Sequence, residues 1–263
     1  MDFKKRFRSL FRSGPSKEFE GDRVRIRRIK SSPGSWLDEN LPAPRLALPP
    51  LGQGELIESA ARRTEDLGAM PLWAGYSELR DYPYAVGSGA QRTSEQVRTS
   101  RQLGGFFAWL VTKRRPTTIV EFGTAFGVSG MYFLAGIEQV GNGVLYTFEP
   151  NEVWAEVARR NLDEVSPRFV LTVGTFEAHV DRVLDASKTI DLALVDAIHT
   201  GDFVDAQFAL IKERLSPSGL VLFDDISFSD DMRRCWNKIA EAGDVRASVE
   251  VQGIGLVEMD ARG

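Results

Sequence analysis

Four titratable side chains follow two apolar segments in the C-terminal half of the chain. Asp196 and His199 come directly after Ile-Asp-Leu-Ala-Leu-Val, and the pair Asp224-Asp225 follows Gly-Leu-Val-Leu-Phe. Carboxylate oxygens are hard ligands that suit Mg²⁺, Mn²⁺ or Ca²⁺, so Asp196, Asp224 and Asp225 are candidate metal ligands. Histidine has an ordinary pKa of about 6.5, and beside a metal it can accept a proton from a hydroxyl, which makes His199 a candidate general base.

Each of these residues also has a structural interpretation. The Asp224-Asp225 pair can cap the loop before Ile226 while Asp196 makes a single hydrogen bond, and a lone histidine is usually structural. Three carboxylates at one place would repel one another without a cation, which favours the metal site. Both interpretations stay open on the sequence alone.

A glycine turn follows an earlier apolar segment, residues 117–122 (Thr-Thr-Ile-Val-Glu-Phe). Gly123 and Gly127 leave room for a ligand to approach the backbone, and the helical pattern that begins at Val128 would present free N–H groups to it. Such a turn is either a ligand cradle or only a tight connection. The dinucleotide spacing G-x-G-x-x-G is absent.

The elements that must position these residues alternate regularly. A strand–helix repeat with apolar strands implies a parallel sheet covered on both faces, with ligands at the carboxyl ends of the strands. A long helix over Ser94–Lys113 precedes the repeat, and a hairpin after it is expected to close the sheet at its edge. We predict strands at 117–122, 144–148, 168–173, 190–195, 219–223, 245–251 and 254–259, and helices at 55–67, 128–139, 151–164, 175–185, 202–215 and 229–242.

Two further strand ends carry candidate binding residues. Glu149 ends the second strand of the repeat, where a carboxylate can accept both hydroxyls of a ribose. Its alternative role is that of an acidic residue favoured by the dipole of the following helix. The third strand ends at Gly174-Thr175-Phe176.

Four motifs in order resemble a class I S-adenosylmethionine-dependent methyltransferase: Val-Glu-Phe-Gly-Thr-Ala-Phe-Gly, Tyr-Thr-Phe-Glu-Pro, Ile-Asp-Leu-Ala-Leu-Val-Asp-Ala-Ile-His and Leu-Ser-Pro-Ser-Gly-Leu-Val-Leu-Phe-Asp-Asp-Ile. The resemblance covers about residues 92–259. It implies an α/β, Rossmann-like sheet of seven strands, the last antiparallel, with helices on both faces. It also implies that S-adenosylmethionine is bound by Glu121, Gly123, Thr124, Gly127, Ser129, Glu149, Gly174, Thr175, Phe176 and Asp196, the first four at the methionine part, Glu149 at the ribose and Thr175-Phe176 beside the adenine.

Within the class, the spacing from Asp196 to Asp224-Asp225 is similar to that of the metal-dependent small-molecule O-methyltransferases. Catechol-type members have a lysine at the position of His199 and Asp-Asn at Asp224-Asp225, so the resemblance favours the sugar or natural-product branch. It implies in-line transfer of a methyl group to an oxygen, with His199 and Asp196 catalytic and a divalent cation, Mg²⁺ or else Mn²⁺ or Ca²⁺, lowering the pKa of the acceptor. The sequence does not identify the acceptor.

Two other functions stay open. An NAD-dependent oxidoreductase would share the glycine turn and the acidic second strand, but the Gly-x-x-x-Gly spacing and the aspartates disfavour it. A methyltransferase-like subunit that binds the cofactor without catalysis is the second alternative.

Composition indicates an ordinary soluble globular protein. The 263 residues are 43% hydrophobic and 27% charged, without a run of about 20 apolar residues or a secretory signal. The single cysteine, Cys235, excludes an internal disulfide, and a cytoplasmic location is expected.

The charge is distributed unevenly. The net charge is −4, but residues 1–30 hold 11 Lys/Arg and 4 Asp/Glu (+7), leaving 22 basic and 33 acidic residues elsewhere (−11). Within residues 1–13, Phe3, Phe7, Leu10 and Phe11 fall on one face of a basic helix, which could lie on an anionic membrane. The same helix could instead dock on its own domain or on a second copy in a homo-oligomer, or remain a frayed tail. Nucleic acid is not expected, because the acidic body would repel phosphates.

The predicted organisation has three parts. Residues 1–30 form a basic amphipathic arm, residues 31–91 an extension that is a candidate substrate lid, and residues 92–263 the S-adenosylmethionine-binding domain. The extension concentrates aromatic residues, which could equally form a satellite core: Trp36, Trp73, Tyr76, Tyr82 and Tyr84.

Overall fold

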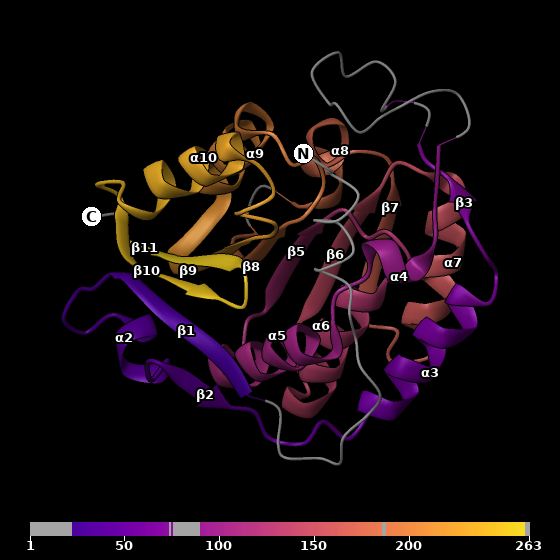
Figure 1. Cartoon of the computed structure of the whole chain (residues 1–263), viewed down its shortest axis with the longest axis horizontal. Helices are drawn as coiled ribbons and strands as arrows, with labels where there is room; N and C mark the ends of the chain where they lie inside the picture. Colours follow the sequence, from indigo (N-terminus) through magenta and orange to yellow (C-terminus); the bar gives the residue numbers. More distant parts are fainter. Residues whose placement is uncertain (1–22, 74, 76–89, 186–187, 261–263) are drawn as a thin grey trace, which may run out of the picture.

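A nine-stranded mixed sheet crosses the middle of the computed structural model (Figure 1). The structure describes residues 23–73, 75, 90–185 and 188–260. The sheet contains, in spatial order, β2 (Arg45–Ala47), β1 (Arg23–Lys30), β10 (Val245–Val251), β11 (Ile254–Met259), β9 (Leu215–Phe223), β8 (Ile190–Val195), β5 (Thr118–Phe122), β6 (Val144–Glu149) and β7 (Phe169–Val173). A separate antiparallel pair consists of β3 (Met70–Pro71) and β4 (Gln91–Arg92).

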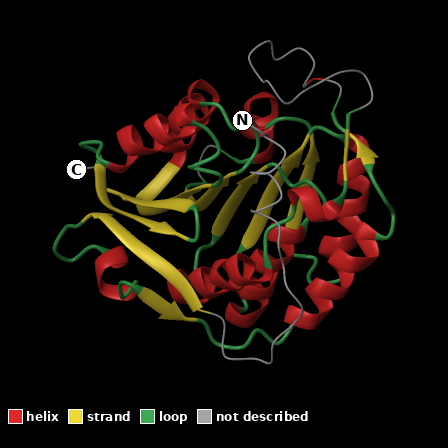
Figure 2. Cartoon of the chain, viewed as in Figure 1, coloured by secondary structure: helices red, strands yellow, loops and turns green. Residues whose placement is uncertain are grey.

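Helices cover both faces of this sheet (Figure 2). One core lies under α5 and α6 and the other under α8, α9 and α10. The helices are α2 (Trp36–Asn40), α3 (Gly54–Glu65), α4 (Ser94–Val97), α5 (Arg101–Arg114), α6 (Val128–Val140), α7 (Glu152–Asp163), α8 (Phe176–Val183), α9 (Gly201–Arg214) and α10 (Asp230–Ala240).

The five strands β9, β8, β5, β6 and β7 run parallel and are the strands of the predicted repeat. All five residues of β5 are buried, so its apolar residues do not alternate with exposed polar ones. The predicted hairpin is confirmed as β10 and β11, with β11 antiparallel to β9. The predicted α/β fold class is therefore confirmed.

The strand count differs from the prediction of seven, because β1 and β2 extend the sheet beyond the hairpin. β1 pairs with β10, and β2 pairs with β1, both antiparallel. Val24 and Ile26 alternate with exposed arginines and fill the core beneath the strand. Residues 23–30 of the predicted arm are thus part of the sheet, and the hairpin does not form its edge.

The predicted long helix over Ser94–Lys113 is wrong in one place, since α4 and α5 are separate helices. Arg98 leaves α4 in an extended conformation, and the Ser100 hydroxyl accepts a hydrogen bond from the backbone N–H of Leu103 to cap α5. The apolar residues continue across the break, so their spacing concealed it.

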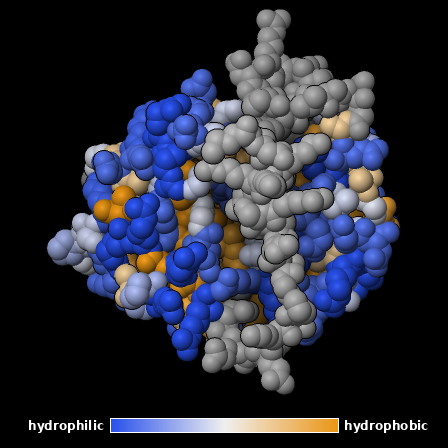
Figure 3. All heavy atoms as spheres, viewed as in Figure 1, coloured by the Kyte–Doolittle hydropathy of each residue, from blue (hydrophilic) through white to orange (hydrophobic). Residues whose placement is uncertain are grey.

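Several predictions concern the rest of the N-terminal part. Trp36 packs on Trp109 of α5 with ring centroids 6.2 Å apart. This contact agrees with the alternative in which aromatic residues of the extension form a satellite core. Residues 1–13, Tyr76, Tyr82 and Tyr84 lie outside the described residues. Within the described part of the chain, no helix is long and apolar enough to cross a membrane. On the face drawn in Figure 3, hydrophilic residues predominate around the periphery.

Candidate active site

The carboxyl ends of the five parallel strands are joined side by side by backbone hydrogen bonds. Asp224 N–H donates to the carbonyl of Val195, and Asp196 N–H donates to Phe122, each over 3.0 Å. Gly123 N–H reaches the carbonyl of Phe148 over 3.2 Å. The sheet therefore places the predicted strand-end residues along one rim, with the aspartates at one side and Glu149 at the other.

The glycine turn after β5 is shaped by its neighbours. Gly123 has a φ of +86°, and a Cβ there would lie 1.8 Å from the carbonyl oxygen of Asp196. Gly127 also has a positive φ, +85°, and begins α6. Any other residue at 123 would therefore collide with the β8 end, so this glycine is what allows the two strand ends to approach each other.

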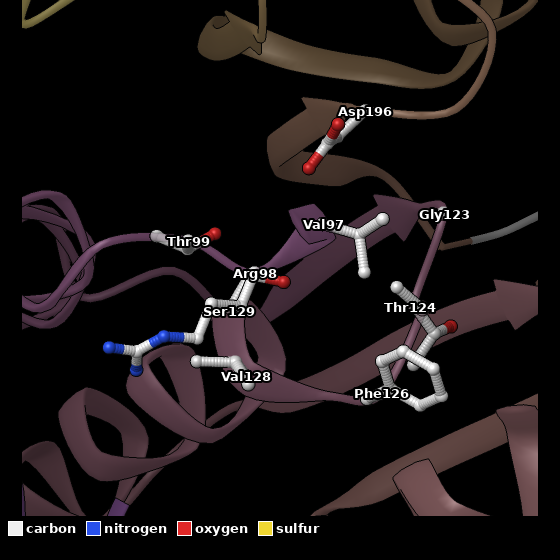
Figure 4. Close-up of a pocket in the computed structure, with 10 residues that line it drawn as sticks. Val97, Arg98, Thr99, Gly123, Thr124, Phe126, Val128, Ser129 and Asp196 are labelled. Carbon is white, nitrogen blue, oxygen red and sulfur yellow. The ribbon is translucent and has the colours of Figure 1, made fainter. Parts of the chain in front are cut away.

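A small hollow opens beside this turn (Figure 4). It is lined by Val97, Arg98, Thr99, Gly123, Thr124, Ala125, Phe126, Val128, Ser129 and Asp196. Four predicted residues, Gly123, Thr124, Ser129 and Asp196, thus share one cavity. The contribution of residues 97–99 was not predicted from the sequence, although the capping serine at position 100 is a signal that could have revealed a loop there.

Glu121 on β5 is fully buried and neighbours Ser129, which lines the hollow. Its Oε2 accepts a hydrogen bond from Thr147 Oγ1 over 2.6 Å, whereas its Oε1 has no partner. Burial raises the pKa of Glu121 to about 7, against the opposing hydrogen bonds from Ser129 and Thr147. A buried carboxylate with an unused oxygen calls for a positive charge nearby, and Ser129 connects it to the hollow.

Glu149 is 5% exposed and has its carboxylate held by the backbone. Oε2 accepts from Ala125 N–H over 2.8 Å, and Oε1 accepts from Asn151 N–H over 2.9 Å. Burial raises the pKa of Glu149 to about 7 despite these two bonds. Each oxygen keeps a further lone pair that can accept a hydrogen bond from a ribose hydroxyl.

The third strand end differs from the expectation in one respect. Gly174 N–H donates to the carbonyl of Glu149 over 3.0 Å, which brings Gly174 and Thr175 next to the second strand end. The ring of Phe176, however, is 2% exposed and packs edge-on against Phe122 and Phe148. Its side chain belongs to the core, which leaves Thr175 as the polar group at this end.

The predicted catalytic cluster is assembled around His199. Its Nε2 lies 3.4 Å from Asp196 Oδ1, and its Nδ1 lies 3.7 Å from Asp225 Oδ2. Burial alone would lower the pKa of His199, but the charges of Asp196, Asp225 and Asp224 outweigh it and raise this pKa to about 9. The protonated imidazole of His199 is therefore the positive charge that faces these three carboxylates in this structure.

The three aspartates supply oxygen donors of the kind that suits a hard divalent cation. Among the described residues, no group of three or more His, Cys, Asp or Glu side chains has the arrangement of a metal site. The side chain of Asp225 is 51% exposed, with the backbone in the left-handed region at a φ of 49°. The pKa of Asp224 is raised well above its usual value, because the group is desolvated and faces Asp196 and Asp225.

A buried ion pair fixes the segment that forms one wall of the hollow. Arg98 Nη1 lies 3.0 Å from Glu58 Oε2 of α3, and Tyr132 of α6 donates its hydroxyl to Glu58 Oε1 over 2.7 Å. In Figure 4 the guanidinium of Arg98 points away from Gly123 and Asp196. Arg98 therefore lines the hollow near its backbone, and its guanidinium holds residues 97–99 in place through the ion pair with Glu58.

Residues 120–226 match the family model described as "Methyltransferase domain". The resemblance to the class I methyltransferases is confirmed. The methyltransferase TomG of Streptomyces achromogenes, involved in tomaymycin synthesis and solved with S-adenosylmethionine, superposes with a TM-score of 0.55 at 19% identity over 80% of this chain and 99% of its own. An O-methyltransferase of Bacillus cereus, solved with S-adenosylhomocysteine, has a TM-score of 0.55 at 16% identity over 86% and 96%. At such identities the likeness shows a shared methyltransferase fold.

A curated relative is similar over part of its length only. The uncharacterized protein y4gI of Sinorhizobium fredii (strain NBRC 101917 / NGR234) is 31% identical over 173 residues, which is 59% of this chain. The match spans 18% of that protein, so the relative is much longer than the region it shares with this methyltransferase-fold chain.

Proposed function

We propose that this protein is an S-adenosylmethionine-dependent O-methyltransferase that acts on a hydroxyl of a small molecule of the sugar or natural-product type. The observation that carries the proposal is the position of the hollow. It lies between the glycine turn after β5 and Asp196, and His199 contacts Asp196 on the same rim.

The residues around the glycine turn fit a cofactor that carries a positive charge. The turn that borders the hollow requires a glycine at position 123, and Glu121, which neighbours Ser129 of the hollow, has an unpartnered Oε1. When bound, S-adenosylmethionine would supply an activated methyl group. The chain's own contribution would be to hold the methionine end beside Ser129 and Thr124, the ribose at Glu149, and the acceptor next to Asp196.

Asp196, Asp224 and Asp225 are the residues that would hold a divalent cation, and His199 would accept the acceptor's proton. When bound, the cation would supply positive charge that stabilises an oxyanion. In the present arrangement the carboxylates keep the proton on His199, with its pKa of about 9. His199 can therefore act as a base near neutral pH only when another cation takes over that charge.

A transfer assay with labelled S-adenosylmethionine and a panel of hydroxylated small molecules tests this function. His199→Ala should reduce turnover roughly a hundredfold or more while cofactor affinity changes little. His179→Ala is the matched control, because His179 lies against Gly174 at the other end of the rim. Wild-type turnover in His199→Ala would remove His199 from the mechanism.

Chelation tests the metal separately. EDTA should abolish the transfer, and Mg²⁺ should restore it. Transfer that persists after thorough chelation would leave Asp196, Asp224 and Asp225 with structural and electrostatic roles. If S-adenosylhomocysteine binds but no acceptor is methylated, the non-catalytic cofactor-binding subunit becomes the better description.

A further inference from the structure

The outward side of the β1–β2 strand pair carries a row of arginines. Arg23, Arg25 and Arg27 alternate along β1 with Val24 and Ile26, and all three are exposed. Arg45 on β2 is exposed as well. Since directly paired residues of an antiparallel ladder point to the same side, Arg45 and its partner Arg25 lie together on this side. We call these four side chains the arginine face.

Most basic residues of β1 have clear structural partners. Arg28 donates to the carbonyl of Leu41 over 2.7 Å, and Lys30 donates to the carbonyl of Ala242 over 2.8 Å. Arg27 is paired in register with Glu250, and its Nε donates to Glu250 Oε2 over 3.0 Å. These residues therefore stabilise the fold.

Arg25 and Arg45 are different. Like charges directly opposite each other on a ladder destabilise the strand pair. Within the described part of the chain, neither guanidinium has an ion pair or side-chain hydrogen bond, and the same holds for Arg23. The carboxylate nearest in the ladder, Glu250, already accepts from Arg27, Arg233 and Trp236. The face thus holds a positive charge that the fold leaves without compensation.

We propose that the arginine face is a docking surface for an anionic lipid membrane. An anionic surface would neutralise Arg25 and Arg45 together and remove their mutual repulsion. β2 is the outermost strand of the sheet, and β10 and β11 separate the β1–β2 pair from the parallel strands that carry the strand-end rim. The inference does not depend on methyl transfer.

The charge of the remaining chain favours a lipid surface over nucleic acid. Residues 31–263 carry 22 basic and 33 acidic residues. A nucleic acid extends beyond a four-arginine patch, so its phosphates would meet this acidic body. Residues 1–22 precede Arg23 in the sequence and include Phe3, Phe7 and Phe11 among basic residues, a composition that suits an anionic membrane interface.

Vesicle co-sedimentation of the full chain tests the proposal. The wild-type chain should bind vesicles of equimolar phosphatidylcholine and phosphatidylserine and not vesicles of phosphatidylcholine alone. The double variant Arg25→Gln/Arg45→Gln should bind about tenfold more weakly or worse, as expected for the loss of two arginines at an anionic surface. Arg25→Lys/Arg45→Lys should retain binding, because the charge is kept.

The matched control is Arg159→Gln/Arg160→Gln on α7, which removes the same charge from two exposed positions away from the face. Equal vesicle binding by the two glutamine variants would overturn the proposal. A dimer in light scattering that only Arg25→Gln/Arg45→Gln dissolves, with vesicle binding unchanged, would assign the face to a second copy and would also overturn it. Folding is checked by thermal unfolding, in which removal of the Arg25–Arg45 repulsion should leave the melting temperature unchanged or raised.

Discussion

Tyr132 on α6 donates its hydroxyl to Glu58 on α3 over 2.7 Å, and both side chains are buried. The other oxygen of Glu58 binds Arg98, whose neighbours form a wall of the hollow. Burial and the nearby Glu58 carboxylate raise the pKa of Tyr132 above its usual range, so the phenol stays a hydrogen-bond donor at any working pH. Through Glu58, α3 of the N-terminal extension is thereby joined to the wall of the hollow beside Gly123.

Tyr132→Phe should remove this bond and lower the free energy of unfolding by roughly 1 kcal/mol. Because Glu58 then holds Arg98 alone, residues 97–99 should move more, and affinity for S-adenosylhomocysteine should fall several-fold. Urea unfolding and calorimetry measure the two effects. Tyr146→Phe is the control, since the Tyr146 hydroxyl pairs with Lys188 and not with the wall. A loss of affinity in both variants, or in neither, would contradict the positioning role.

Gly123→Ala should disrupt the turn, because its Cβ would lie 1.8 Å from the Asp196 carbonyl oxygen. The predicted result is loss of S-adenosylhomocysteine binding by about tenfold or more, measured by calorimetry. Gly141→Ala provides the control: its φ of +75° imposes a comparable backbone strain, roughly 1 kcal/mol, but the new methyl meets nothing within 4 Å. Retained binding in Gly123→Ala would show that the turn does not shape the site.

Cofactor affinity should depend on pH through Glu121. Its pKa is raised from 4.5 to about 7, so the carboxyl is neutral below about pH 7 and ionised above it. Only the ionised form attracts the ligand's ammonium, and affinity for S-adenosylhomocysteine should therefore rise from about pH 6 to about pH 8. Glu121→Gln should weaken this dependence and leave the part due to Glu149. A wild-type profile that is flat across this range would contradict the charge role of Glu121.

The same raised pKa predicts the opposite trend for the protein without cofactor. A raised carboxyl pKa means that the folded state holds its proton more tightly than the unfolded state. The folded protein therefore loses stability as the pH rises from about 4.5 through about 7. Thermal unfolding of wild type and Glu121→Gln across this window measures the contribution, which should be absent in the variant.

The contribution of Glu250 to holding β1 in the sheet should depend on pH. Burial alone would raise its pKa, but bonds from Arg27, Trp236 and Arg233 outweigh this and lower the pKa below 4.5. Glu250 therefore stabilises the folded state above pH 4.5, which is its pKa in the unfolded chain. This stabilisation is lost as the pH falls through the lower pKa of the folded state. Glu250→Gln should cost roughly 1–2 kcal/mol near neutral pH, and the difference should vanish in acid. The exposed Glu156→Gln should show no such loss, and a constant difference at every pH would contradict the assignment.

The sequence predicted the parallel half of the fold well because its strands are buried on both faces. The apolar residues Ile119, Val120 and Phe122 of β5 stop at Gly123, so both the strand and its rim residues could be located. Parallel strands then bring their carboxyl ends together, and this is why Asp196, His199 and Gly123 could be expected at one place from their positions along the chain.

The N-terminal half was predicted less well for identifiable reasons. Four arginines and a lysine dominate residues 23–30, and their charge concealed the period-two alternation of Val24 and Ile26. The break at Arg98 depends on Glu58, a partner 40 residues earlier, and spacing along one helix cannot indicate such a contact. The ring of Phe176 follows a strand end but turns into the core, which depends on Phe122 and Phe148.

The central claim is that the hollow beside Gly123 and Asp196 binds S-adenosylmethionine. Its most direct test is calorimetric titration of the full chain with S-adenosylhomocysteine and, separately, with NAD. We expect one-to-one binding of S-adenosylhomocysteine that Gly123→Ala weakens by about tenfold or more and Gly141→Ala preserves, and no binding of NAD. Binding of NAD, or no binding of S-adenosylhomocysteine by the folded wild-type chain, would contradict it.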